Sequence, residues 1–96
     1  MTEPKNRFYK ARKRAMQILE WSGYRVTPQY DGIFDVEATR EVELRKIKIC
    51  IDSISKTDID QLKKIMLPQF CKKEIWCKKM SSSNFEIIEI KNHVKS

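Results

Sequence analysis

Glycine and proline are scarce in this sequence of 96 residues, which has only 2 glycines and 3 prolines. A phosphate-binding loop needs several glycines close together, because its backbone N–H groups must approach the phosphates. Gly23 and Gly32 are too far apart in the chain to build such a loop. A glycine-rich phosphate site is therefore excluded.

Cysteine and histidine are also few. The 3 cysteines are Cys50, Cys71 and Cys77, and the single histidine, His93, lies in a polar tail. Zinc sites space their ligands in patterns such as C-x-x-C or H-x-x-x-H, and neither pattern occurs here. We therefore predict scattered, buried free thiols and an inert His93, and the odd cysteine count predicts a reducing, intracellular location.

Long apolar runs are missing as well. No run approaches the ~18 residues that a membrane span needs, and residues 1–10 are too polar for a signal peptide. Hydrophobic residues make up 41% and charged residues 34%, as in globular domains. We expect one domain over residues 1–96 with flexible ends at 1–5 and 92–96, in the cytoplasm and without a membrane partner.

Basic residues, in contrast, are abundant. Lysine and arginine number 20 against 13 acidic residues, which gives a net charge of +7. A positive surface attracts polyanions over about 8–10 Å, which favours nucleic acid or an anionic membrane as the partner. The alternative is a charge that only keeps the protein soluble. Clustering of the charges distinguishes the two interpretations.

The first segment has the pattern of an amphipathic helix. Its apolar residues recur at three- and four-residue steps: Phe8, Ala11, Ala15, Ile18 and Leu19. Thr2 suits the N-cap, Pro4 the first turn and Gly23 the C-terminal end. Its exposed side is a cationic stripe formed by Lys5, Arg7, Lys10, Arg12, Lys13 and Arg14. An ordinary solvated helix face is the alternative interpretation.

Three strands are predicted next. Residues 24–27 form a short strand closed by Pro28, and the loop QYDG follows. Apolar and polar residues alternate from Phe34 to Thr39 and again from Arg45 to Asp52, as in strands with one buried face. A turn at residues 40–42 would pair these two segments as an antiparallel hairpin.

A second helix and two more strands complete the chain. Residues 55–68 are helical, capped by Ser55 or Thr57 and ended by Pro68, with an apolar side of Ile59, Leu62, Ile65 and Met66. EIWCK and FEIIEI are strands joined by KMSSSN. The order α-β-β-β-α-β-β predicts an α/β (α+β) fold with a mixed five-stranded sheet between two helices. We expect core anchors at Trp21, Tyr24, Trp76 and Phe85, while Tyr9 and Tyr30 are free to stack on bases.

This order, with an antiparallel hairpin in the middle, resembles the restriction-endonuclease-like core of the PD-(D/E)xK nuclease superfamily. ILEWSGYRV looks like the helix end and first strand of archaeal Holliday junction resolvases and their small phage-type relatives, and GIFDVEA looks like their strand with the pattern G-hydrophobic-hydrophobic-D-hydrophobic-x-A. EIWCKK and NFEIIEI look like the closing hairpin of the short members. The likeness extends over residues 6–91 and implies a Mg²⁺-dependent endonuclease acting on branched or double-stranded DNA.

The resemblance also implies where the site lies. In that superfamily the aspartate in the position of Asp35 binds a divalent metal, and an acidic residue or glutamine and then a lysine on the next strand complete the site. Here Lys48 stands in place of the second ligand, and Cys50 in place of the lysine. An ammonium group repels Mg²⁺, and a thiol is a poor ligand for this hard cation. The acidic residue of the first helix is also missing, since Lys10 to Arg12 occupy that region.

A shifted site is the alternative. Asp35 and Glu37 project from one face of their strand, and Lys48, Cys50 and Asp52 from one face of theirs. A metal held by Asp35 and Glu37, with Asp35, Lys48 and Asp52 as catalytic residues, would make an active endonuclease. About 13 Å of extended strand separates Lys48 from Asp52, which argues against one shared metal.

Three functions follow from these patterns. The first is a nuclease-like protein that binds DNA or RNA, duplex or branched, without cutting it and without a cofactor, through the cationic stripe, Lys46 and Lys48. The second is an active endonuclease that needs Mg²⁺ or Mn²⁺, acts on branched or double-stranded DNA and can form a homodimer. The third is a structural or regulatory module that binds another protein through an exposed apolar surface. The altered site favours the first.

Overall fold

The computed structural model describes residues 4–79 and 84–91, and side chains from residue 7 onward within these ranges. The elements follow in the order α1 (Pro4–Trp21), β1 (Arg25–Pro28), β2 (Val36–Arg40), β3 (Glu43–Ile51), α2 (Lys56–Lys64), β4 (Cys71–Lys78) and β5 (Phe85–Ile90). Residues 4 and 5, expected in a flexible end, are the start of α1. The predicted ends at 1–3 and 92–96, with His93, lie outside the described residues.

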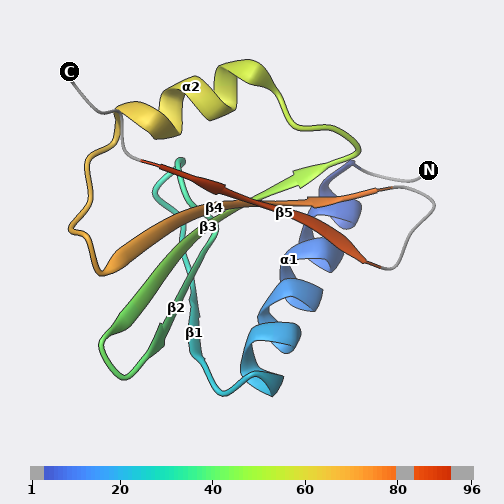
Figure 1. Cartoon of the computed structure of the whole chain (residues 1–96). Coiled ribbons are helices and arrows are strands. Elements are labelled where there is room, and N and C mark those ends of the chain that lie inside the picture. Colours follow the sequence, from blue (N-terminus) through green and yellow to red (C-terminus); the bar gives the residue numbers. More distant parts are fainter. Residues whose placement is uncertain (1–3, 80–83, 92–96) are drawn as a thin grey trace.

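In the described part of the chain, five strands form one mixed sheet in the order β1-β2-β3-β4-β5 (Figure 1). β3 and β4 run parallel, and all other neighbours are antiparallel. Parallel strands cannot be joined by a tight hairpin, so the chain crosses between β3 and β4 through α2. The prediction of an α+β fold with a mixed five-stranded sheet and two helices is confirmed.

α1 packs against one face of the sheet through the apolar stripe that its sequence predicts. The first core cluster contains Ala11, Ala15, Leu19, Tyr24, Val36, Ala38, Ile47, Ile49 and Trp76. α1 contacts β1, β2 and β3, and Trp76 of β4 packs in the same cluster. The opposite side of the helix, which carries the basic residues, is left facing the solvent.

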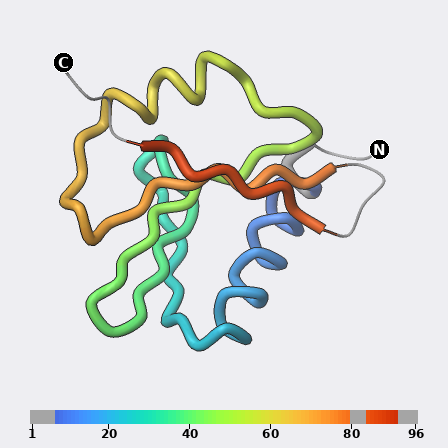
Figure 2. Tube along the Cα trace, in the orientation of Figure 1, coloured from blue at the N-terminus to red at the C-terminus, as the bar shows by residue number. Residues whose placement is uncertain are grey.

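α2 covers the other face, as the chain trace shows (Figure 2). Ser55 is its N-cap, and the Ser55 hydroxyl accepts a hydrogen bond from the Asp58 N–H at 3.3 Å. The second core cluster contains Phe34, Leu62, Ile75 and Ile90. Within the described residues, no helix combines the length and the apolar character needed to cross a bilayer.

α2 is shorter than the sequence predicts. It ends at Lys64 with Ile65 as its C-cap, and Met66, expected on its buried side, is 64% exposed. The reason is Lys73, a buried lysine of β4. Its Nζ donates hydrogen bonds to the carbonyls of Leu62 and Ile65, each at 2.6 Å. These bonds satisfy carbonyl groups at the helix end and make a further turn unnecessary.

Two other predictions change in the structure. Trp21 is 71% exposed, not a core anchor, and the Arg14 guanidinium lies 5.0 Å from its ring centre. Tyr24 and Trp76 are buried as predicted, and Phe85 is half-buried. β1 includes Pro28, because an edge strand tolerates a residue without an N–H.

Candidate nucleic-acid interface

Asp35 directly precedes β2 and lies beside the part of β3 that extends past the pairing with β2. Its main-chain N–H donates to the Ile47 carbonyl at 2.8 Å, and its Oδ2 accepts a hydrogen bond from the Ile49 N–H at 2.8 Å. Its carboxylate thus satisfies a backbone donor on the part of β3 that extends past β2. Asp35 therefore has a structural role, and metal binding by its carboxylate stays a prediction.

Burial and the neighbouring polar groups have opposite effects on the pKa of the Asp35 carboxyl. Burial is the largest influence and raises the pKa of the Asp35 carboxyl above its usual value. The hydrogen bond from Ile49 and the positive charges of Lys48 and Arg12 lower this pKa. Lys48 of β3 and Arg12 of α1 thus lie within electrostatic reach of Asp35. Of the residues expected with Asp35, Lys48 is near it, and Arg12 is an additional neighbour from α1.

The Asp52 carboxylate does not lie beside Lys48 but contacts α1. β3 ends at Ile51, and Asp52 has a φ of 72°, in the left-handed region. The alternation that would place Asp52 beside Lys48 therefore stops one residue earlier. The Asp52 carboxylate instead accepts a hydrogen bond from Arg7 of α1 at 2.9 Å, on the opposite face of the sheet.

Glu37 is on the expected face but is already paired. Its Oε1 lies 3.0 Å from the Lys46 Nζ. A metal held by Asp35 and Glu37 would have to compete with this ion pair and with the Ile49 hydrogen bond. Among the residues that the structure describes, no three acidic, cysteine or histidine side chains converge on one point where a metal ion could bind.

Cys50 stands opposite Cys77 of β4, so these two thiols are neighbours and not scattered. Its Sγ donates to the Ser53 carbonyl at 3.4 Å. Burial, followed by the contact with Cys77, raises the pKa of the Cys50 thiol to about 12. A protonated thiol supplies neither a positive charge nor a ligand for a hard metal. All three cysteines are free as predicted, and Cys71 and Cys77 are buried, but Cys50 is only half-buried.

The basic stripe of α1 borders two grooves. The first, which we call the cationic groove, has a volume of about 370 Å³. Its basic lining residues are Arg7, Lys10 and Arg14 of α1, with Lys78 and Lys79 at the end of β4. Ala11 and Ile51 also line it and give it an apolar part. Lys78, the last residue of β4, and Lys79, which follows it, were missed by sequence reasoning, because their closeness to α1 depends on the sheet order.

The positive charge of α1 is only partly neutralised. Arg7 pairs with Asp52, and Lys79 lies 3.5 Å from Glu86. Within the described part of the chain, Lys10, Lys13 and Arg14 form no ion pair with an acidic side chain. These exposed side chains are available to an external anion.

The second groove, which we call the tyrosine groove, lies between α1 and the β1–β2 connection and has a volume of about 450 Å³. Tyr9 and Tyr30 are 51% and 77% exposed, so they lie outside the core as expected, and base stacking by them stays a prediction. The Arg12 guanidinium lies 5.2 Å and 5.0 Å from their ring centres. Cation–π attraction at this range orders the two rings around one positive charge.

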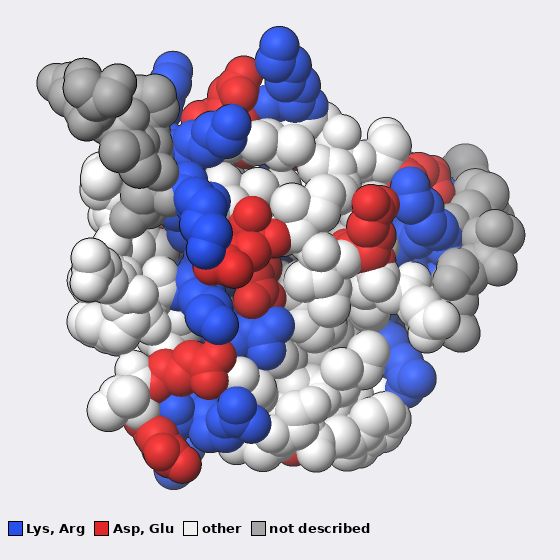
Figure 3. Space-filling model, viewed as in Figure 1, with Lys and Arg blue, Asp and Glu red and all other residues white. Residues whose placement is uncertain are grey.

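Lys46 does not belong to this surface. It lies on the face of the sheet opposite α1, paired with Glu37 and 3.3 Å from the Gln29 side-chain oxygen. Lys5 is in the first part of α1, where side chains are not described. Elsewhere the charges are mixed: blue and red atoms are interleaved on the face in Figure 3, and the ion pairs Lys72–Glu43 and Lys91–Glu89 are examples of such mixing.

No model of a known protein family matches this sequence, and no curated protein shows significant similarity to it. What the chain does must therefore be inferred from its own residues.

Proposed function

We propose that this chain binds nucleic acid through the outer surface of α1 and the adjoining end of β4, and that it does not cleave it. The observation that carries the proposal is the cationic groove, where α1 and β4 contribute five basic side chains. Each lysine or arginine that contacts a phosphate releases counterions from the nucleic acid, which is a main source of affinity.

We further propose a restriction-endonuclease-like core for this protein. Three observations support it: the element order, the two helices on opposite faces of a mixed sheet, and the position of Asp35 at the start of the central hairpin. Loss of cleavage is supported by Lys48 and Cys50, which replace the second metal ligand and the lysine. The ion pair of Glu37 with Lys46 adds to this support.

Charge reversal tests the binding surface. We expect Lys10→Glu with Lys13→Glu to weaken binding to DNA and RNA oligonucleotides at least about tenfold in a fluorescence anisotropy titration at low salt. The matched control is Lys56→Glu with Lys63→Glu on α2, which gives the same change in net charge on the other side of the sheet. Equal losses in both variants, or no binding by the wild-type protein to any nucleic acid, would reject the proposal.

An active endonuclease is the second candidate, favoured by the environment of Asp35. A half-buried carboxyl with a raised pKa next to Lys48 and Arg12 is typical of functional sites as well as structural ones. Incubation with duplex, single-stranded and four-way DNA in Mg²⁺ or Mn²⁺ separates the candidates. Cleavage that Asp35→Ala abolishes and the exposed control Asp60→Ala retains would establish the enzyme.

A further inference from the structure

We infer that the tyrosine groove binds an unpaired nucleobase, so that the preferred ligand is a single strand or a junction with an unpaired segment. This inference rests on the proposed nucleic-acid binding and specifies its ligand. It adds base recognition to a surface that would otherwise contact only phosphates.

The groove has the composition of a stacking site. Tyr9 and Tyr30 offer exposed rings, Pro28 and Met16 add apolar surface, and Arg12 lies between the two tyrosines. Every base has an apolar face that stacks on such rings, and a guanidinium plane stacks in the same way. A volume of about 450 Å³ is within the usual range for small-ligand sites.

The surface of α1 between the two grooves provides a path for the backbone. Lys10 lines the cationic groove, and Lys13 lines the tyrosine groove. Residues three apart on a helix lie on the same side, about 5–6 Å apart at Cβ, which is close to the spacing of successive phosphates along a strand. A strand crossing α1 can therefore place phosphates near Lys10 and Lys13 while a base stacks on the exposed ring of Tyr30.

An intact duplex does not satisfy this geometry. Its bases are stacked on one another inside the helix, so their faces are not accessible to the tyrosines without unpairing. The cationic groove alone would bind duplex and single strand through their phosphates. The tyrosine groove distinguishes them, which makes Tyr9 and Tyr30 the residues that decide ligand preference.

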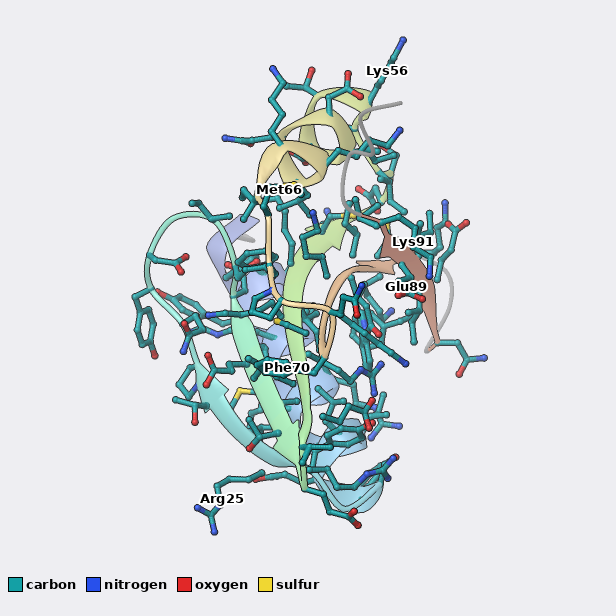
Figure 4. All side chains as sticks on the ribbon, turned by 60° about the vertical axis from the view of Figure 1, so that its left-hand side comes forward. Arg25, Lys56, Met66, Phe70, Glu89 and Lys91 are labelled. Atoms are coloured by element: carbon teal, nitrogen blue, oxygen red, sulfur yellow. The ribbon has the colours of Figure 1, made fainter. Side chains whose placement is uncertain are left out.

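Alanine substitution of the stacking ring tests this inference. We expect Tyr30→Ala to weaken binding of a short thymine or uracil oligonucleotide about 5- to 150-fold, the effect of losing one stacked base, and to change duplex binding less than about twofold. Tyr30→Phe should retain the affinity. The matched control is Phe70→Ala, since Phe70 is 58% exposed and borders a groove lined by Glu37, Glu41 and Glu43. Figure 4 shows Phe70 on the near side of the sheet, with α1 behind it.

Photocrosslinking gives a second, positional readout. A strand containing 5-iodouracil should crosslink to Tyr9 or Tyr30 in the wild-type protein, and mass spectrometry should locate the modified residue. Crosslinks elsewhere, or equal losses of single-strand and duplex affinity in Tyr30→Ala, would overturn the base site. If the Lys10→Glu/Lys13→Glu variant still loses affinity in that case, phosphate binding stands without base recognition. A wild-type protein that binds no oligonucleotide overturns both.

Discussion

At the scale of single residues, Asp35 combines two requirements that conflict at neutral pH. Its carboxylate accepts the Ile49 N–H, yet burial raises its pKa, so the folded protein holds a proton there more tightly than the unfolded chain does. The resulting stabilisation is fully present below the ordinary pKa of 3.8 and is lost as pH rises through the raised pKa. The charged carboxylate therefore carries a burial cost at pH 7.

Asp35→Asn keeps an oxygen that can accept the Ile49 N–H but removes the charge. We expect it to raise the free energy of unfolding at neutral pH relative to the wild type, and we expect this difference to shrink as the pH falls below 3.8. Urea unfolding at the two pH values measures it, with Asp60→Asn on the surface of α2 as the control. A variant less stable than the wild type at neutral pH would show that Lys48 and Arg12 outweigh the burial.

Lys73 is a second residue with a defined structural task. Its ammonium group is buried against the last carbonyls of α2, and burial lowers its pKa. We expect Lys73→Met to lower the free energy of unfolding by about 1–3 kcal/mol, because the Ile65 carbonyl loses its Lys73 donor and the Leu62 carbonyl keeps only the Ile65 N–H. The exposed neighbour variant Lys72→Met should have little effect. Chemical denaturation of both variants makes the comparison.

The pH dependence of Lys73 has a definite sign. A lowered pKa means that the folded state disfavours the charged lysine, so its contribution to stability is lost as pH falls through the lowered pKa and regained toward the ordinary value of 10.5. The stability difference between the wild type and Lys73→Met should therefore grow as the pH rises toward 10.5. A difference that stays constant over this range would contradict the burial argument.

At the scale of elements, the parallel pair β3 and β4 is joined by a buried ion pair. Arg45 donates two hydrogen bonds to Glu74, at 3.0 Å and 2.6 Å, and the Trp76 indole N–H donates to Glu74 at 2.9 Å. The Arg45 guanidinium also lies 5.1 Å from the Tyr24 ring centre. The polar groups of Arg45, Glu74 and Trp76 are thus paired beside the core cluster under α1.

Removing one partner of this ion pair should lower the free energy of unfolding substantially. We expect Glu74→Ala to destabilise the protein by about 3–5 kcal/mol, since it leaves the Arg45 charge buried without a partner. The double variant Arg45→Met/Glu74→Leu should recover most of the loss, because no charge then remains to be buried. Denaturant unfolding of the single and double variants forms the test. An equal loss in the double variant would assign the cost to packing and not to charge.

At the scale of the whole molecule, the charge of +7 is unevenly distributed. Among the described residues, Lys10, Lys13 and Arg14 of α1 form no ion pair, whereas Lys46, Lys72 and Lys91 pair with neighbouring acids. We expect the affinity for a single-stranded oligonucleotide to fall about 100-fold between roughly 50 and 200 mM salt, the dependence for about five phosphate contacts. An affinity that hardly changes with salt would point to binding through apolar contacts instead.

The elements could be predicted from the sequence because their signals are local. The spacing of Ala11, Ala15 and Leu19 defines the buried side of α1, and strand alternation defines β2 and β3. The sequence also predicted which side of α1 carries the basic residues, and it predicted that Tyr9 and Tyr30 are exposed. Periodicity reports which side of one element faces the core, and that is enough to place the basic stripe outside.

The arrangement of the site was decided by tertiary structure. Asp52 leaves the strand alternation and pairs with Arg7, Lys73 ends α2 early, and Lys78 and Lys79 join α1 in one groove. Each depends on a contact between segments distant in the chain, which no local pattern encodes. The sequence by itself determined the elements, their order and the basic side of α1. Sheet order and helix packing decided which charges meet and which remain free to bind, because those pairings exist only once distant segments are adjacent.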